Sequence, residues 1–147
     1  MSKEILIDKL KSIWQKSKLL ASDIIETPPV CFSYESETYK SIIGTLGNFT
    51  LITGRAKSRK TFFISVLGAI ALNNGTHLGI KASFPDSQKK VLYFDTEQSK
   101  YHAKKVLTRI LKINKINETE HPENLEFVLL RPFSPQTRLD VMDYIIN

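Results

Sequence analysis

Apolar residues recur along this chain at two spacings, and the spacing decides which element each stretch predicts. Short apolar runs bounded by turn residues, typical of buried strands, occupy residues 49–53, 90–95 and 125–130. Helical spacing or helix start signals mark residues 61–72, 99–113 and 135–146. The last helix has Ser134 as its expected N-cap and Pro135 as its first residue. The alternation βαβαβα predicts an α/β fold with a parallel sheet covered by helices on both faces.

The residues before this alternation predict an appended part. A helix is expected from Lys3 to Ala21, and Trp14 is expected to face a core, with an interface as the alternative. The segment from Val30 to Ile43 alternates in a way that is typical of a short β-hairpin. The expected division is an N-terminal helix and hairpin, residues 1–44, followed by a core, residues 45–147.

Composition narrows the class of protein. With 147 residues and 41% hydrophobic content, the chain suffices for one packed core. Its single cysteine, Cys31, excludes an intrachain disulfide and a cysteine zinc cluster, and the three histidines lack ligand spacing. We expect no leader, because the first residues lack a charged-then-apolar pattern, and the longest apolar run, residues 61–72, is shorter than the roughly 20 residues of a membrane span. We therefore expect a cytoplasmic protein without a membrane partner.

One loop carries most of the candidate chemistry. It reads Gly54-Arg55-Ala56-Lys57-Ser58-Arg59-Lys60-Thr61, and it fits the phosphate-binding pattern G-x-x-x-x-G-K-[ST] at three of four fixed positions. A triphosphate needs backbone N–H donors, the positive end of a helix and a mobile ammonium. Gly54 would make the tight turn, Lys60 would reach the β- and γ-phosphates of ATP, and the Thr61 hydroxyl would bind Mg²⁺.

Arg59 is the irregular position, because it stands where the pattern has its second glycine. Its side chain would crowd the approach of phosphate to the backbone, or its guanidinium would add a contact to an anion. For the whole loop, the alternative is a basic, solvated turn between a strand and a core helix. The sequence leaves both questions open.

Two carboxylates follow the second expected core strand. Val91-Leu92-Tyr93-Phe94 runs into Asp95-Thr96-Glu97, at the sheet edge where phosphates would lie. One carboxylate would belong to the Mg²⁺ shell, with Asp95 as the candidate, and another would orient and deprotonate the attacking water. The alternative is an acidic turn that caps the next helix through Thr96 or Glu97.

The net charge of +6 lies in the second part of the chain, because residues 51–147 contain 15 basic and nine acidic residues. Part of the excess belongs to the loop, and part to Lys104, Lys105, Arg109 and Lys112 on one face of an expected helix. Polyphosphate or nucleic acid would suit this field, and a solvated helix face is the alternative. DNA is an expected partner.

The spacing of Gly54–Thr61 and of Phe94-Asp95-Thr96-Glu97-Gln98 resembles the RecA-like P-loop ATPases, particularly the RepA-type helicases and the AAA-family ATPases of mobile elements in Bacteroidetes. The resemblance implies a three-layer P-loop NTPase sheet, incomplete at the C-terminus. It also implies that Glu97 is the catalytic carboxylate and that Lys60 and Thr61 bind ATP and Mg²⁺. The variant loop, with Arg59 before Lys60 and Thr61, would be a feature of one subgroup of the family. A homo-oligomeric ring that hydrolyses ATP to act on DNA would follow.

The metal-binding aspartate of that family follows a later strand, and Asn147 ends this chain before it. We therefore expect an N-terminal piece of a longer ATPase that is inactive on its own. An alternative of another class is a non-hydrolysing nucleotide- or DNA-binding regulatory module with a degenerate loop. A small-molecule kinase would also use such a loop, but only Arg131 and Arg138 are available for its lid.

Overall fold

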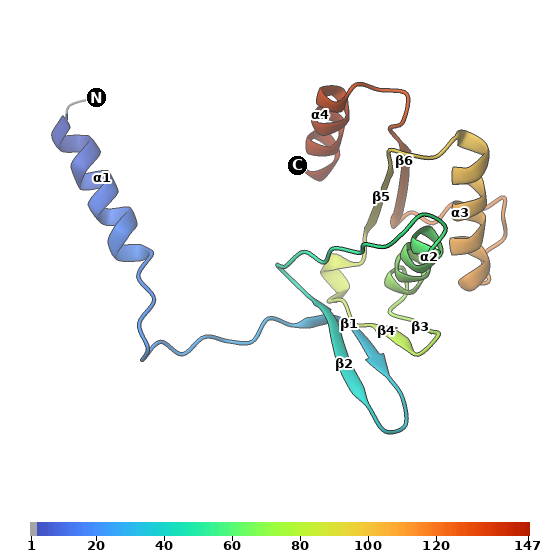
Figure 1. Cartoon of the computed structure of the whole chain (residues 1–147), viewed down its shortest axis with the longest axis horizontal. Helices are drawn as coiled ribbons and strands as arrows, with labels where there is room; N and C mark the ends of the chain where they lie inside the picture. Colours follow the sequence, from blue (N-terminus) through green and yellow to red (C-terminus); the bar gives the residue numbers. More distant parts are fainter. Residues whose placement is uncertain (1–2) are drawn as a thin grey trace.

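The computed structural model describes residues 3–147. Its elements in chain order are α1 (Lys3–Lys16), β1 (Val30–Glu35), β2 (Lys40–Thr45), α2 (Lys60–Ala71), β3 (Thr76–His77), β4 (Ile80–Ala82), the 3-10 turn η1 (Asp86–Gln88), β5 (Val91–Asp95), α3 (Lys100–Ile113), β6 (Leu125–Leu129) and α4 (Pro135–Ile146). Figure 1 shows α2 between the strands of the hairpin and α3.

The three helices expected after residue 45, and two of the three strands, are confirmed. The helices α2, α3 and α4 and the strands β5 and β6 all lie within one residue of their expected bounds. The start signal of α4 also holds, since the Ser134 hydroxyl accepts a hydrogen bond of 3.2 Å from the N–H of Thr137. The expected hairpin is formed by β1 and β2, with Glu35 opposite Lys40.

The expected three-layer parallel sheet of a RecA-like P-loop NTPase is wrong. The main sheet has four antiparallel strands in the order β2-β1-β4-β3. Parallel pairing within residues 3–147 is confined to β5 and β6, which align Asp95 with Leu129. Leu92, Phe94 and Val128 of this pair are half-buried, and no residue of α4 is buried, so α4 does not form a packed layer on the pair.

The strand expected immediately before the phosphate-binding loop does not form. Residues 49–53 have no strand partner, and the side chains of Phe49 and Leu51 are 95% and 79% exposed. An apolar run predicts a strand only where a neighbouring strand supplies the ladder of hydrogen bonds. Here β5 and β6 pair with each other, and neither pairs with residues 49–53.

The antiparallel sheet contains two strands that the sequence does not predict. In β4, Ile80 and Ala82 are buried and Lys81 between them is exposed, which is the alternation of a half-buried strand. Three residues are too few for this alternation to be recognised in a sequence. Because β4 pairs with β1 and with β3, the hairpin and residues 76–82 belong to one sheet. The division of the chain at residue 44 into two parts is not tested by this pairing and stays a prediction.

The helix α2 supplies both hydrophobic clusters of the fold. On one side, Ala69 packs with Val106 and Ile110 of α3 and with Leu125 of β6. On the other side, Ile70 packs with residues of the antiparallel sheet and its flanks. Burying a side chain such as Ile70 contributes roughly 1.5–3 kcal/mol to stability. Because its residues belong to both clusters, α2 joins the two sheets.

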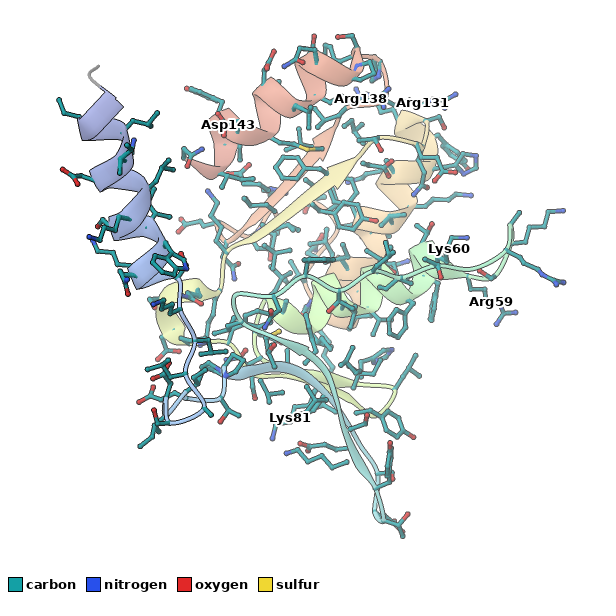
Figure 2. All side chains as sticks on the ribbon, turned by 60° about the vertical axis from the view of Figure 1, so that its left-hand side comes forward. Arg59, Lys60, Lys81, Arg131, Arg138 and Asp143 are labelled. Atoms are coloured by element: carbon teal, nitrogen blue, oxygen red, sulfur yellow. The ribbon has the colours of Figure 1, made fainter. Side chains whose placement is uncertain are left out.

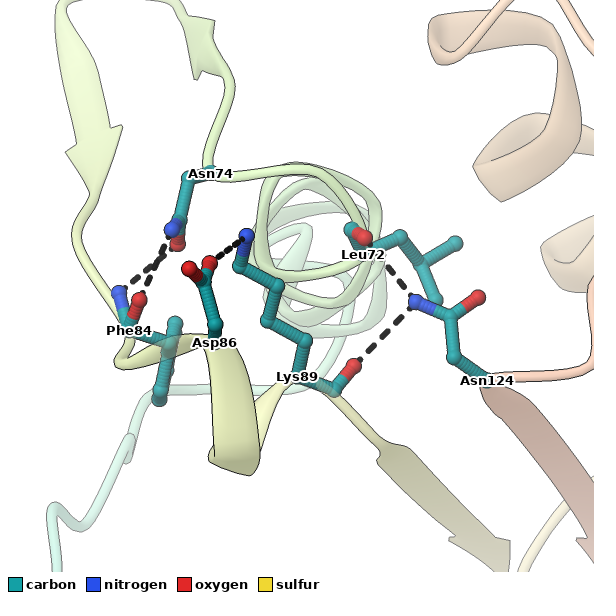
Figure 3. Close-up of polar contacts among 6 residues, drawn as sticks. All are labelled: Leu72, Asn74, Phe84, Asp86, Lys89 and Asn124. Atoms are coloured by element: carbon teal, nitrogen blue, oxygen red, sulfur yellow. Dashed lines mark hydrogen bonds and ion pairs between the residues drawn. The ribbon is translucent and has the colours of Figure 1, made fainter.

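Two asparagines fasten the end of α2 to its surroundings (Figure 3). The Asn74 amide donates to the carbonyl oxygen of Phe84 at 2.8 Å and accepts from the N–H of Phe84 at 2.7 Å. The Asn124 amide donates to the carbonyl oxygens of Leu72 at 2.9 Å and Lys89 at 3.2 Å. These bonds satisfy backbone groups where regular structure ends and hold the start of β6 beside α2.

The N-terminal helix ends earlier than expected and does not join the core. It stops at Lys16 instead of Ala21, and Figure 1 shows it apart from the other elements. Trp14 is 59% exposed, so its expected place in a core is wrong. Amphipathic spacing identified the helix, but it could not show whether another element covers its apolar stripe. No helix within residues 3–147 has the length and apolar character needed to cross a membrane.

Candidate functional site

The first turn of α2 leaves its backbone N–H groups open to an anion. The helix begins at Lys60, and the residue at its N-cap, Arg59, makes no side-chain capping bond. No acidic side chain lies in the first turn. The free N–H groups and the partial positive charge of a helix N-terminus attract phosphate. This confirms the loop-to-helix junction, although no strand precedes the loop.

Arg59, the irregular position in the phosphate-binding pattern, has a backbone conformation typical of glycine. Arg59 has φ 64° and ψ 24°, in the left-handed region where glycine is ordinarily favoured, and Lys57 has φ 63°. A residue with a Cβ adopts this conformation at a cost of about 1–2 kcal/mol. Arg59 therefore keeps the backbone shape that a glycine would give, and its side chain is exposed.

Lys60 lies folded across the loop that precedes it. Its ammonium donates hydrogen bonds to the carbonyl oxygens of Gly54 at 2.8 Å and Arg55 at 3.0 Å. Figure 2 shows Arg59 and Lys60 at the same end of α2. A Cβ at Gly54 would lie 2.7 Å from the Ser58 hydroxyl, so the loop has little room for a side chain there. The positive group is thus held beside the loop by backbone oxygens.

The structure brings Glu97 to the loop. One hollow of about 430 Å³ is lined by residues 56–61 and by Glu97, which follows the end of β5. Both Glu97 and most of the loop are exposed, so the hollow is open to solvent. A carboxylate facing a basic loop and a helix N-terminus is the arrangement that the two sequence signals predicted separately.

Asp95 supports the backbone that carries Glu97. Its side chain is buried, at 5% exposure, and its Oδ1 accepts hydrogen bonds from the N–H of Glu97 at 3.0 Å and of Gln98 at 2.8 Å. Its Oδ2 is buried without a hydrogen-bond partner in the described chain. Asp95 does not line the hollow, and its role as a metal ligand stays a prediction.

The acidic turn after β5 does not cap α3. The N-cap of α3 is Ser99, and neither Thr96 nor Glu97 occupies that position. Instead, the turn is closed by Asp95, whose Oδ1 accepts hydrogen bonds from the N–H groups of Glu97 and Gln98. The alternative that Glu97 serves only as a helix cap therefore loses its main support.

A metal ion at this site would take most of its ligands from phosphate or water. Within residues 3–147 no group of three or more histidine, cysteine, aspartate or glutamate side chains is placed to hold a metal. The residues fit Mg²⁺ bound together with a nucleotide, because that ion keeps few protein ligands and takes phosphate oxygens. Thr61 lines the hollow, and the Oδ2 of Asp95, two residues before Glu97, is buried without a hydrogen-bond partner in the described chain.

Arg109 has a role that the sequence does not reveal. Instead of facing solvent with the other basic residues of α3, it donates to the Ser65 hydroxyl at 3.2 Å and lies over the ring of Phe62, at 5.2 Å. Both partners belong to the first half of α2, so Arg109 holds α3 against the helix that follows the loop. Helical spacing alone gives no signal of this contact.

The comparisons with known proteins do not identify a relative. No family model matches the chain, and no match was found among curated proteins or solved structures. The RecA-like resemblance stays an expectation from the two motifs, and the functional argument rests on the site itself.

Proposed function

We propose that the loop of residues 54–61 and Glu97 form a binding site for ATP together with Mg²⁺. The observation that carries this proposal is the shared hollow of about 430 Å³, in which Glu97 faces residues 56–61 at the N-terminus of α2. The N–H groups of the first turn would donate hydrogen bonds to phosphate oxygens. The Lys60 ammonium would leave its two backbone carbonyl partners and donate to phosphate oxygens instead.

The proposed roles of the carboxylates differ. Glu97 is exposed in the hollow, and it is placed to accept a proton from a water that attacks the γ-phosphate. Asp95 fixes the backbone of Glu97 through its Oδ1. A bound Mg²⁺ would neutralise charge on the phosphates, with Thr61 as its protein ligand.

The proposal extends to hydrolysis that drives a helicase-like action on DNA in the cytoplasm. Its support is the excess of basic residues after residue 50 and the resemblance of the two motifs. A non-hydrolysing binding module is the second candidate. The observation that favours it is the missing strand before the loop, because that strand would hold the loop rigidly in line with β5.

Displacement of a fluorescent ATP analogue by unlabelled nucleotides in the presence of Mg²⁺ tests the proposal. ATP and ADP should displace the analogue, and AMP should be at least about tenfold weaker, because Lys60 and the helix N-terminus act on the β- and γ-phosphates. Equal displacement by AMP would contradict a phosphate site at this loop. Displacement by ATP without any turnover would favour the non-hydrolysing module.

A further inference from the structure

All the charged side chains of α3 are basic. Every ionisable side chain of this helix except Tyr101 and His102 is a lysine or arginine, and none is acidic. Arg109 turns toward α2, and Lys112 pairs with Glu118 at 2.9 Å. Three lysines near the start of the helix remain exposed, and the side chains of residues 5–147 include no acidic partner for them: Lys100, Lys104 and Lys105.

An aromatic side chain lies among these lysines. Tyr101 is 65% exposed, the Lys105 ammonium lies 4.5 Å from the centre of its ring, and the His102 ring meets it edge-on at 5.4 Å. Lys100 and Lys104 are one helical turn apart, or about 6 Å along the axis. Cations at this spacing beside a largely exposed aromatic ring suit the repeating phosphates and unstacked bases of a single strand.

The surface beside this face is hollowed. A recess of about 400 Å³ has apolar walls that include Leu107 and Phe127, and Lys100, Tyr101 and Lys104 also line it. A second recess of about 390 Å³ shares Lys100 and reaches Arg131 beyond the end of β6. Figure 2 shows Arg131 beside Arg138, whose guanidinium donates to the Arg131 carbonyl oxygen at 2.9 Å and fixes this turn.

We propose that Lys100, Tyr101, Lys104, Lys105 and Arg131 form a binding surface for single-stranded nucleic acid. The cations bind successive phosphates, and Tyr101 stacks on a base. The walls of the recess accept the apolar faces of bases, which a duplex keeps stacked inside. The proposal rests on the DNA part of the proposed function, but it uses none of the residues of the ATP hollow.

Fluorescence anisotropy with a labelled oligothymidylate tests the surface. The triple variant Lys100→Gln, Lys104→Gln, Lys105→Gln should bind at least about tenfold more weakly at low salt, and its slope of log K against log salt should be shallower by about two, since each phosphate contact contributes about 0.7. The matched control removes three lysines that pair with glutamates: Lys40→Gln, Lys81→Gln, Lys90→Gln. Equal weakening in both triple variants would overturn the proposal.

Tyr101→Ala separates stacking from charge. It should weaken binding of the single strand by about fivefold or more and leave binding of inorganic polyphosphate unchanged. An unchanged affinity for the single strand, or a duplex bound as tightly as the single strand, would overturn the assignment. Titration with ATP distinguishes this failure from failure of the ATP site. The triple lysine variant should keep its ATP affinity, and Lys60→Ala should keep its affinity for the oligonucleotide.

Discussion

The Lys60 ammonium donates a hydrogen bond of 2.8 Å to the carbonyl oxygen of Gly54, six residues before it. A second bond, to Arg55 at 3.0 Å, holds the same group across the loop. A phosphate entering the hollow would compete with these two oxygens for the ammonium. Because a charged acceptor forms the stronger hydrogen bond, the exchange favours the phosphate. Without an anion, Lys60 is bonded to the loop backbone, and a bound anion would replace these two hydrogen bonds.

Replacing Arg59 by glycine should stabilise the fold. Arg59 has φ 64°, and glycine adopts this conformation without the cost that a Cβ brings. We expect the free energy of unfolding to rise by about 1 kcal/mol, measured by urea denaturation. The matched control is Arg55→Gly in the same loop, where φ is not positive and glycine should lower stability by entropy alone. A loss of stability in Arg59→Gly would show that the arginine side chain has contacts that outweigh the strain.

Replacing Glu97 by glutamine should separate binding from hydrolysis. The amide keeps the shape of the side chain but cannot accept the proton of the attacking water. In protein that hydrolyses ATP, turnover should fall by about a hundredfold or more, whereas ATP affinity should change little. The exposed residue Glu120 provides the control, and Glu120→Gln should alter neither quantity. Turnover that is unchanged in Glu97→Gln would remove Glu97 from the chemistry.

Ionisation of Tyr93 should destabilise the fold at high pH. Burial raises the pKa of Tyr93, and the charge of Asp95 raises it further, while Arg109 lowers it. The folded state therefore holds the phenolic proton more tightly than the unfolded chain does. The stability from this residue is fully present below pH 10, the ordinary pKa of tyrosine, and is lost as pH rises through the higher pKa of the folded state.

The variant Tyr93→Phe isolates this effect and keeps the stacked contact with Phe127, whose ring centre lies 4.4 Å away. Unfolding by urea at pH 8 and at a pH above 10 should show a smaller loss of stability in Tyr93→Phe than in the unchanged chain. An equal loss in both proteins would show that Tyr93 does not carry the pH dependence.

Asn74 should be one of the most sensitive polar positions. Its side chain makes two hydrogen bonds with the backbone of Phe84, and its φ of 54° is left-handed. Asn74→Ala loses both bonds and adds backbone strain, so it should cost about 2–4 kcal/mol. Asn74→Gly loses the same two bonds, but glycine adopts the left-handed conformation without strain. Its cost in stability should therefore be about 1 kcal/mol smaller than that of Asn74→Ala. Equal costs would mean that backbone strain at this residue is negligible.

Much of the second half of the fold could be predicted from sequence, because local signals specify it. Ser134 followed by Pro135 starts α4, and the apolar stripe of α3 faces the core through Ala103, Val106 and Ile110. The sheet could not be predicted in this way. An apolar run such as residues 49–53 records a tendency to pair, whereas the pairing itself depends on which strands are available.

The candidate site was likewise predictable from the sequence only in part. The loop and Glu97 follow from a motif and from the end of a strand, and the structure places them around one hollow. The conformation of Arg59 and the bonds of Asp95 to the turn depend on backbone geometry that residue types do not specify. The basic face of α3 was visible in the sequence, but only contacts distinguish Arg109, which packs on α2, from the exposed lysines.

Calorimetric titration with ATP and Mg²⁺ is the most direct test of the central claim that residues 54–61 bind a triphosphate. The unchanged chain should bind saturably, Lys60→Ala should lose at least about tenfold in affinity, and Lys81→Ala, which removes an exposed lysine of β4, should bind as the unchanged chain does. Absence of binding to the unchanged chain, or equal binding by the unchanged chain and Lys60→Ala, would contradict the claim.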